Sequence, residues 1–215
     1  MSLSSSATAD TPCGRAPVIE ALAVLAVTLP LAVGLRYPTL WFVAPFAIVT
    51  LTGRPYAVYG LTLRGPGTLG FHLVTATLIF GGYALLHYAF ARLVLGLRFE
   101  LTLPDDFADV VITQLLVIGL SEEFFFRGYL QTHFNCRFGR PWQFLGARFG
   151  WGLPLAAVLF GVCHLVTGDI TRLRVIVFGL FAGWLRERTD TIAVPAAYHG
   201  VANILYEVMA RSMIR

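Results

Sequence analysis

The chain has 215 residues, of which 57% are hydrophobic and only 13% are charged, and its mean hydropathy is +0.72. A soluble domain of this length keeps much of its surface wet, so the composition predicts an integral membrane protein instead. The net charge of +4 includes sixteen basic residues, all arginine, which are scattered between apolar runs and argue against nucleic-acid binding.

Apolar stretches with the character of membrane-spanning helices recur along most of the chain. With about twenty apolar residues as the length of a span, the sequence predicts helices near 16–35, 38–52, 70–91, 107–130, 151–168, 173–185 and 191–210. The second and sixth are short for a span. Residues 1–15 form a polar N-terminal tail, and residues 16–215 form a single membrane domain. The predicted fold is therefore all-α, a polytopic membrane bundle of about seven transmembrane helices, within a range of roughly six to eight.

Two connecting segments are predicted to lie at the membrane interface. Residues 53–70 are rich in arginine, proline and glycine, and residues 131–150 combine arginines with Trp142 and several phenylalanines. Asp105 and Asp106 suit the start of the fourth helix, because acidic groups there meet free backbone amides. The arginines divide almost evenly between the two membrane faces, so they do not determine the orientation.

The fourth predicted helix carries charges inside its apolar segment, SEEFFFRGYL at residues 121–130. An ionised carboxylate in hydrocarbon is costly, so these charges should face a protein interior or a water-filled cavity and have a function. Glu123 and Arg127 are four residues apart and can pair on one helix face. Glu122 points about 100° away from Glu123. The spacing predicts that Glu123 and Arg127 form a structural ion pair and that Glu122 is the free, reactive carboxylate.

Two later helices carry histidines in apolar surroundings, His164 in LFGVCHLV and His199 with Asn203 in AAYHGVANIL. At about 1.5 Å per residue, Glu122 and His199 each lie roughly 12 Å below one membrane face, and His164 lies roughly 20 Å below it. Because helix boundaries carry errors of a few residues, these depths describe one layer. The alternative, a buried ion-pair network that only holds helices together, would not explain the matching depths.

A carboxylate, two imidazoles and an amide around one cavity supply the parts for hydrolysis. Glu122 and His164 could hold a water and remove its proton, and His199 and Asn203 could donate hydrogen bonds to the oxyanion of an attacked carbonyl. A nucleophilic Ser121 would leave Glu122 and Asn203 without clear tasks. Zinc stays an alternative, because Glu122, His164 and His199 are an acceptable ligand set, although the HExxH motif is absent.

Together the three segments resemble the CPBP family of intramembrane proteases, which includes the CAAX-processing endopeptidase of prenylated proteins. The family motifs EExxxR, FxxxH and HxxxN stand here in order as EEFFFR (122–127), FGVCH (160–164) and HGVAN (199–203). The resemblance covers residues 107–210, and the first three helices match in character only. It implies a glutamate-dependent endopeptidase in which Glu122 and His164 activate water. It further implies that His199 and Asn203 form the oxyanion site, with support from Glu123, Arg127 and Phe160.

The same resemblance implies cleavage near the C-terminal membrane anchor or lipidated end of a substrate protein, without a cofactor. Some bacterial relatives are myxosortase-like sorting peptidases, and others are bacteriocin immunity proteins. The expected partners are a membrane-anchored or lipidated protein and the lipid bilayer, and the expected location is a bacterial inner membrane. Because the first three helices match poorly, a non-enzymatic immunity or scaffolding factor is the alternative function.

Other polar and small residues are predicted to serve packing. His72, His87 and His133 have no motif around them and are interpreted as packing or interfacial residues. Cys163 is interpreted as a small buried hydrophobe. Gly200 ends a pair of small residues four apart, a pattern that lets helices approach closely and would bring the polar residues together.

Overall fold

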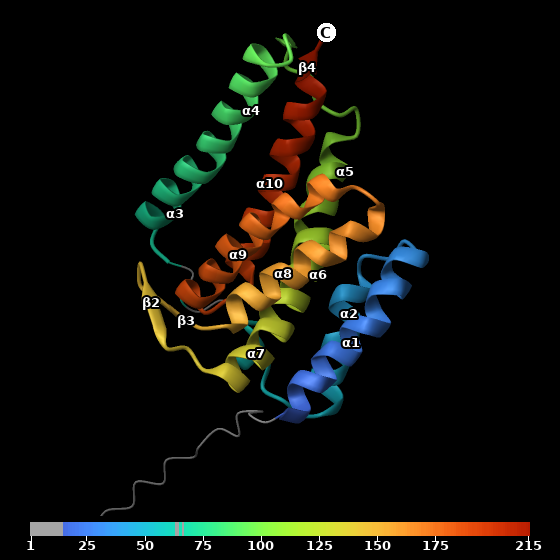
Figure 1. Cartoon of the computed structure of the whole chain (residues 1–215), viewed down its shortest axis with the longest axis vertical. Helices are drawn as coiled ribbons and strands as arrows, with labels where there is room; N and C mark the ends of the chain where they lie inside the picture. The colour runs from blue at the N-terminus through green and yellow to red at the C-terminus, as the bar shows by residue number, and fades with distance from the viewer. Residues whose placement is uncertain (1–14, 63–64, 66) are drawn as a thin grey trace, which may run out of the picture.

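The computed structural model of the protein describes residues 15–62, 65 and 67–215 (Figure 1). Apart from its last residue, the predicted N-terminal tail lies outside this part of the chain. Helices make up nearly all regular structure of the described residues, so the all-α prediction is confirmed.

The helical segments follow the apolar runs of the sequence. The α-helices are α1 (Arg15–Gly34), α2 (Leu40–Leu51), α3 (Leu69–Ala76), α4 (Gly82–Leu93), α5 (Phe107–Ile112), α6 (Leu120–Glu123), α7 (Gln131–Phe138), α8 (Gly152–His164), α9 (Val175–Thr189) and α10 (Ala193–Ser212). Wider π-helical turns at η2 (Thr77–Gly81), η3 (Thr113–Gly119) and η4 (Phe124–Leu130) join α3 to α4 and α5 through α7 into two longer helices. Short 3-10 turns occur at η1 (Tyr56–Tyr59), η5 (Leu165–Thr167) and η6 (Ile170–Arg174).

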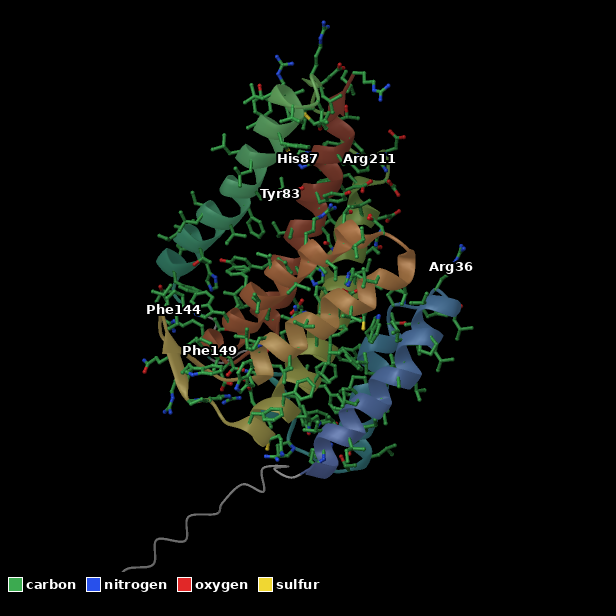
Figure 2. All side chains as sticks on the ribbon, in the orientation of Figure 1. Arg36, Tyr83, His87, Phe144, Phe149 and Arg211 are labelled. Carbon is green, nitrogen blue, oxygen red and sulfur yellow. The ribbon has the colours of Figure 1, made fainter. Side chains whose placement is uncertain are left out.

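Two short antiparallel strand pairs accompany the helices. Strand β1 (Arg98–Phe99) pairs with β4 (Met213–Ile214), with Arg98 opposite Ile214. Strands β2 (Trp142–Phe144) and β3 (Ala147–Phe149) form a hairpin, with Trp142 opposite Phe149. Phe144 and Phe149 of this hairpin lie at the edge of the molecule, near the start of α3 (Figure 2).

Each of the seven predicted helices falls on a helical segment. Two segments of the described chain, Pro17–Gly34 and Leu69–Leu93, are long and apolar enough to cross a membrane, and Leu40–Leu51 and Gly152–His164 are shorter apolar helices. Length and composition thus support two spans. The arrangement with about seven spans stays a prediction.

The fourth helix is longer than predicted, because it continues without a break from Phe107 to Phe138. The interpretation of residues 131–150 as an interfacial connector is wrong for residues 131–135, which are buried. Gln131 and Asn135 both donate hydrogen bonds to Glu187 Oε1 on α9, at 2.7 and 2.6 Å, so their polar groups have partners inside the protein. The remaining part is the β2–β3 hairpin, which exposes Trp142 and Phe144.

Aromatic side chains of η4 form the centre of the core. Phe124, Phe125 and Phe126 are at most 1% exposed. The Phe125 ring meets Trp41 of α2 edge-on at 4.8 Å between centroids, and the Phe126 ring meets Phe160 of α8 at 5.0 Å. Aromatic pairs with this geometry contribute about 0.5–1.5 kcal/mol beyond their buried area. The packing therefore holds the helix that carries the two glutamates between α2 and α8.

Candidate active site

The polar segments meet around His199 on α10. Its Nδ1 lies 2.8 Å from Glu123 Oε1, and its Nε2 lies 3.8 Å from Glu122 Oε2. The His199 side chain is 6% exposed, Glu123 is fully buried, and Glu122 is 15% exposed. Glu122 and His199, which the sequence places at one depth, are therefore neighbours. The imidazole lies between the two adjacent carboxylates.

Glu123 has two cationic or hydrogen-bonding partners on the same oxygen. Arg127 Nη1 lies 2.9 Å from Glu123 Oε1, and neither side chain has any exposed surface. The ion pair that the spacing predicts is present, and the contact with His199 is an addition that helical spacing did not indicate. A buried charge needs such partners, because removal from water costs several kcal/mol per ion. Glu123 thus links the helix that carries Arg127 to the helix that carries His199.

Helix α10 approaches η3 closely because glycines stand at their crossing. A Cβ atom added to Gly119 would lie 2.8 Å from the Ala196 carbonyl oxygen. One added to Gly200 would lie 2.8 Å from the Cα atom of Leu115. Real Cβ atoms do not tolerate such distances to backbone, so the crossing requires glycine at both positions. This contact brings His199, the neighbour of Gly200, within reach of the glutamates.

Phe160 on α8 connects the two histidines. Its ring centroid lies 4.5 Å from the His164 ring and 5.8 Å from the His199 ring. The guanidinium carbon of Arg127 lies 4.4 Å from the same centroid, in a cation–π contact. His164 Nδ1 donates to the Phe160 carbonyl oxygen at 2.8 Å. Since a carbonyl only accepts, this contact leaves Nε2 as the acceptor atom of a neutral His164 ring.

Asn203 is held by a residue that sequence reasoning missed. Its Nδ2 donates to Gln114 Oε1 on η3 at 2.8 Å. An amide nitrogen carries two hydrogens, so this bond orients the side chain and leaves a second N–H for another acceptor. The only signal for Gln114 in the sequence is a single amide side chain inside the largely apolar run VVITQLLVIGL.

Several buried polar atoms of this cluster have no hydrogen-bond partner among the described residues. They include Glu122 Oε2, Glu123 Oε2, and Nε and Nη2 of Arg127. An unpaired buried polar atom is costly, and all four of these atoms belong to the Glu122–Glu123–Arg127 cluster. The orphaned oxygen of Glu122 is the one that faces His199 Nε2.

The alternatives to glutamate chemistry find less support in this geometry. Within the part of the chain that the structure describes, no three or more His, Cys, Asp or Glu side chains form a group that could hold a metal ion. No chemical step is assigned to zinc, and Glu122, His164 and His199 stay a ligand set that the sequence alone suggests. Cys163 is buried, at 8% exposure, as expected for a small packing residue. His133 is fully buried and packs edge-on against Tyr129.

Residues 104–205 match the model of a protein family described as type II CAAX prenyl endopeptidase, Rce1-like. The matched segment begins just before α5 and ends within α10, so it contains every site residue from Gln114 to Asn203. It agrees with the resemblance to CPBP proteases that the three motifs indicate. Comparisons with curated proteins and with solved structures found no match.

Proposed function

We propose that this chain, whose residues 104–205 match the model of a family described as type II CAAX prenyl endopeptidase, Rce1-like, is an intramembrane endopeptidase that uses a glutamate-activated water. The observation that carries the proposal is the position of His199 between Glu122 and Glu123 inside the family segment. Glu123 orients the imidazole of His199, and Glu122 Oε2 lies beside that imidazole without a hydrogen-bond partner among the described residues. Such an oxygen is suited to bind a water and polarise it.

Glu122 is the proposed base. Its Oε2 is buried without a partner among the described residues, while the side chain keeps 15% exposure, so water can reach the carboxylate. A water bound there gives one proton to Glu122 as its oxygen forms a bond to the scissile carbonyl carbon. His164 accepts the second hydrogen bond of that water through Nε2. The proton on Glu122 then passes to the leaving amine nitrogen as the C–N bond breaks.

His199 and Asn203 are the proposed oxyanion donors. His199 Nδ1–H donates to Glu123, and in the imidazolium form Nε2–H is a second donor that points toward Glu122. Asn203 adds its second N–H. Donors aimed at an oxyanion in a dry site each contribute about 2.7–4 kcal/mol to transition-state stabilisation.

The proposed substrate is a membrane-anchored or lipidated protein, cleaved near its C-terminal anchor. Two observations support this class. The matched family is described as a CAAX prenyl endopeptidase, and the described part of the chain has two helices long and apolar enough to cross a membrane. We propose that the protein lies in a membrane, and more specifically in a bacterial inner membrane.

The test is cleavage of a farnesylated CAAX peptide and of a C-terminally anchored reporter by the purified protein. Glu122→Gln, His164→Ala and His199→Ala should each lower the rate by at least about a hundredfold. Glu207→Gln is the matched control, because Glu207 pairs with Arg211 on the exposed face of α10 at 2.7 Å. It should keep the wild-type rate.

Each alternative has its own outcome in this experiment. Full activity in Glu122→Gln would end the glutamate mechanism. Inactivation by a chelator that added zinc reverses would establish a metalloprotease. A cellular effect that survives the combined loss of Glu122, His164 and His199 would identify an immunity or scaffolding factor.

A further inference from the structure

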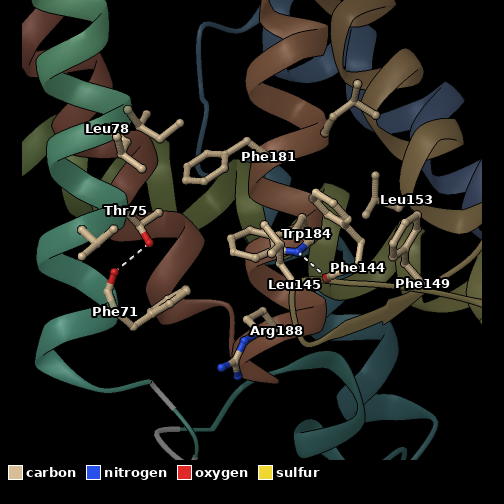
Figure 3. A pocket seen from close by; sticks show the side chains of 13 residues that line it. Phe71, Thr75, Leu78, Phe144, Leu145, Phe149, Leu153, Phe181, Trp184 and Arg188 are labelled. Carbon is tan, nitrogen blue, oxygen red and sulfur yellow. Dashed lines mark hydrogen bonds between the residues drawn. The ribbon is translucent and has the colours of Figure 1, made fainter.

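A cavity is formed by α3 and η2, the β2–β3 hairpin, and helices α8 and α9 (Figure 3). Its volume is about 690 Å³, within the range of small-molecule sites. The proposed catalytic residues do not line it. It is therefore a different site from the one around His199.

The walls of this cavity are suited to hydrocarbon. They are formed mainly by aromatic and aliphatic side chains, among them Phe71, Phe181 and Trp184. The indole N–H of Trp184 donates to the Phe144 carbonyl oxygen at 3.1 Å, and the Thr75 hydroxyl donates to the Phe71 carbonyl oxygen at 2.7 Å. Because these polar groups already have partners, they need no hydrogen bond from a bound molecule. An apolar chain would fit without leaving a polar group unpaired.

One end of the cavity is positively charged. The guanidinium of Arg188 lies there (Figure 3), with its central carbon 5.4 Å from the Phe71 ring centroid. Arg188 is exposed, and among the described residues no carboxylate lies within ion-pair distance of it. An unpaired cation at the end of an apolar cavity complements an amphiphile with an anionic head and a hydrocarbon tail.

The cavity opens toward the surface that a bilayer would cover. Val74, Leu78 and Leu145 line it and are 62%, 69% and 68% exposed. The apolar helix Leu69–Leu93, which includes the first two, has only 6% of its residues buried against protein. Lining residues on α9 extend from Leu180 to Arg188, a rise of about 12 Å. That length is close to the depth of one leaflet of hydrocarbon, about 15 Å.

We propose that this cavity binds one acyl chain of an anionic phospholipid from the surrounding bilayer, and that Arg188 contacts the phosphate of its headgroup. The chain fills the space between α3 and α9 and so attaches the sparsely packed helix Leu69–Leu93 to the rest of the protein. The proposal does not depend on peptidase activity, because it concerns a different cavity and is measured by binding.

The experiment uses the full chain, purified in detergent and stripped of lipid. Dioleoylphosphatidylglycerol or dioleoylphosphatidylcholine is added in mixed micelles, and native mass spectrometry counts the lipids retained per protein. The wild type should retain one phosphatidylglycerol in preference to phosphatidylcholine. Arg188→Gln should lower the affinity for phosphatidylglycerol about fivefold, which corresponds to about 1 kcal/mol, and leave that for phosphatidylcholine unchanged. Arg188 is exposed, so this variant should fold.

Two matched controls separate the cavity from the general surface. Val74→Trp, which fills the cavity, should reduce retention of both lipids, whereas Leu73→Trp, at a neighbouring exposed position outside the lining, should reduce neither. Arg148→Gln removes an exposed arginine of the hairpin and should leave the phosphatidylglycerol preference intact.

Three results would overturn the proposal. The first is equal retention of the two lipids by the wild type. The second is an equal effect of Arg148→Gln and Arg188→Gln, which would reduce the preference to general surface attraction. The third is displacement of the bound lipid by a farnesylated peptide, which would make the cavity a substrate site.

Discussion

Glu123 Oε1 accepts hydrogen bonds from two different helices, from His199 Nδ1 at 2.8 Å and from Arg127 Nη1 at 2.9 Å. The shared oxygen couples the orientation of the proposed oxyanion donor to a fully buried ion pair. Glu122, one residue earlier, has no hydrogen-bond partner for its Oε2 among the described residues. Replacement by glutamine should therefore lower the unfolding temperature at Glu123 but not at Glu122.

Glu123→Gln should destabilise the protein and lower its activity together. It removes the charge opposite Arg127, and breaking a buried ion pair from one side costs about 3–5 kcal/mol. For a chain of this size, that cost corresponds to a fall of roughly 10 °C in the apparent unfolding temperature. Intrinsic fluorescence during a thermal scan in detergent measures the shift. An unchanged unfolding temperature would show that Arg127 does not depend on this carboxylate.

Glu122→Gln should abolish cleavage while it preserves or slightly raises the unfolding temperature. Its buried Oε2 has no hydrogen-bond partner among the described residues, so the neutral amide removes a desolvation cost. It gives up only the long 3.8 Å contact with His199 Nε2. The same thermal scan and a cleavage assay on one preparation measure both quantities. A large loss of stability in this variant would mean that Glu122 is a structural residue and not the base.

The positions of the helices could be predicted from the sequence because apolar runs alternate with segments rich in arginine, glycine and proline. The end of the fourth helix could not be predicted from the sequence. Gln131 and Asn135 look like headgroup-level residues in the sequence, and only the fold brings Glu187 of α9 to their amides. Polarity predicts exposure only where no polar partner is brought close by tertiary packing.

The candidate site was predictable where it depends on spacing within one helix or on depth in the bilayer. Glu123 with Arg127 follows from helical geometry, and Glu122 with His199 follows from matched depths. The hydrogen bond between Glu123 and His199 depends on how α10 is rotated about its axis. The spacing of residues within either helix carries no information about that rotation. The second partner of Glu123 is therefore a finding of the structure alone.

Gln114 should act as a positioning residue through Asn203. Gln114→Leu removes the acceptor of the 2.8 Å bond and lets the Asn203 amide turn, so kcat should fall about tenfold, part of the loss expected for a complete oxyanion donor. KM should stay unchanged, because the contact is made in the transition state.

Gln114→Glu is the conservative control, since a carboxylate accepts the same hydrogen bond from Asn203 Nδ2. It should retain more activity than Gln114→Leu when the steady-state rates of both are compared. Equal losses in the two variants would indicate that Gln114 serves packing and does not orient Asn203.

Gly200→Ala should separate α10 from η3 and so disturb the site without touching a proposed catalytic residue. The new methyl group would lie 2.8 Å from the Cα atom of Leu115, and backbone cannot give way as a side chain does. Overpacking of this kind costs about 1–3 kcal/mol. Because His199 precedes Gly200, the shift moves its imidazole relative to Glu122, and a displacement of about 1 Å is enough to lower the rate about a hundredfold.

Gly82→Ala on α4 is the matched control, because a Cβ there meets no atom within 4 Å. Alanine is the better helix former by about 1 kcal/mol, so this variant should be as stable as the wild type or more stable, and equally active. The comparison isolates the helix crossing from the general effect of replacing glycine in a helix. If Gly200→Ala cleaves the reporter at the wild-type rate, the close approach of α10 to η3 is not what places His199 beside the glutamates, and the proposed geometry of the site fails with it.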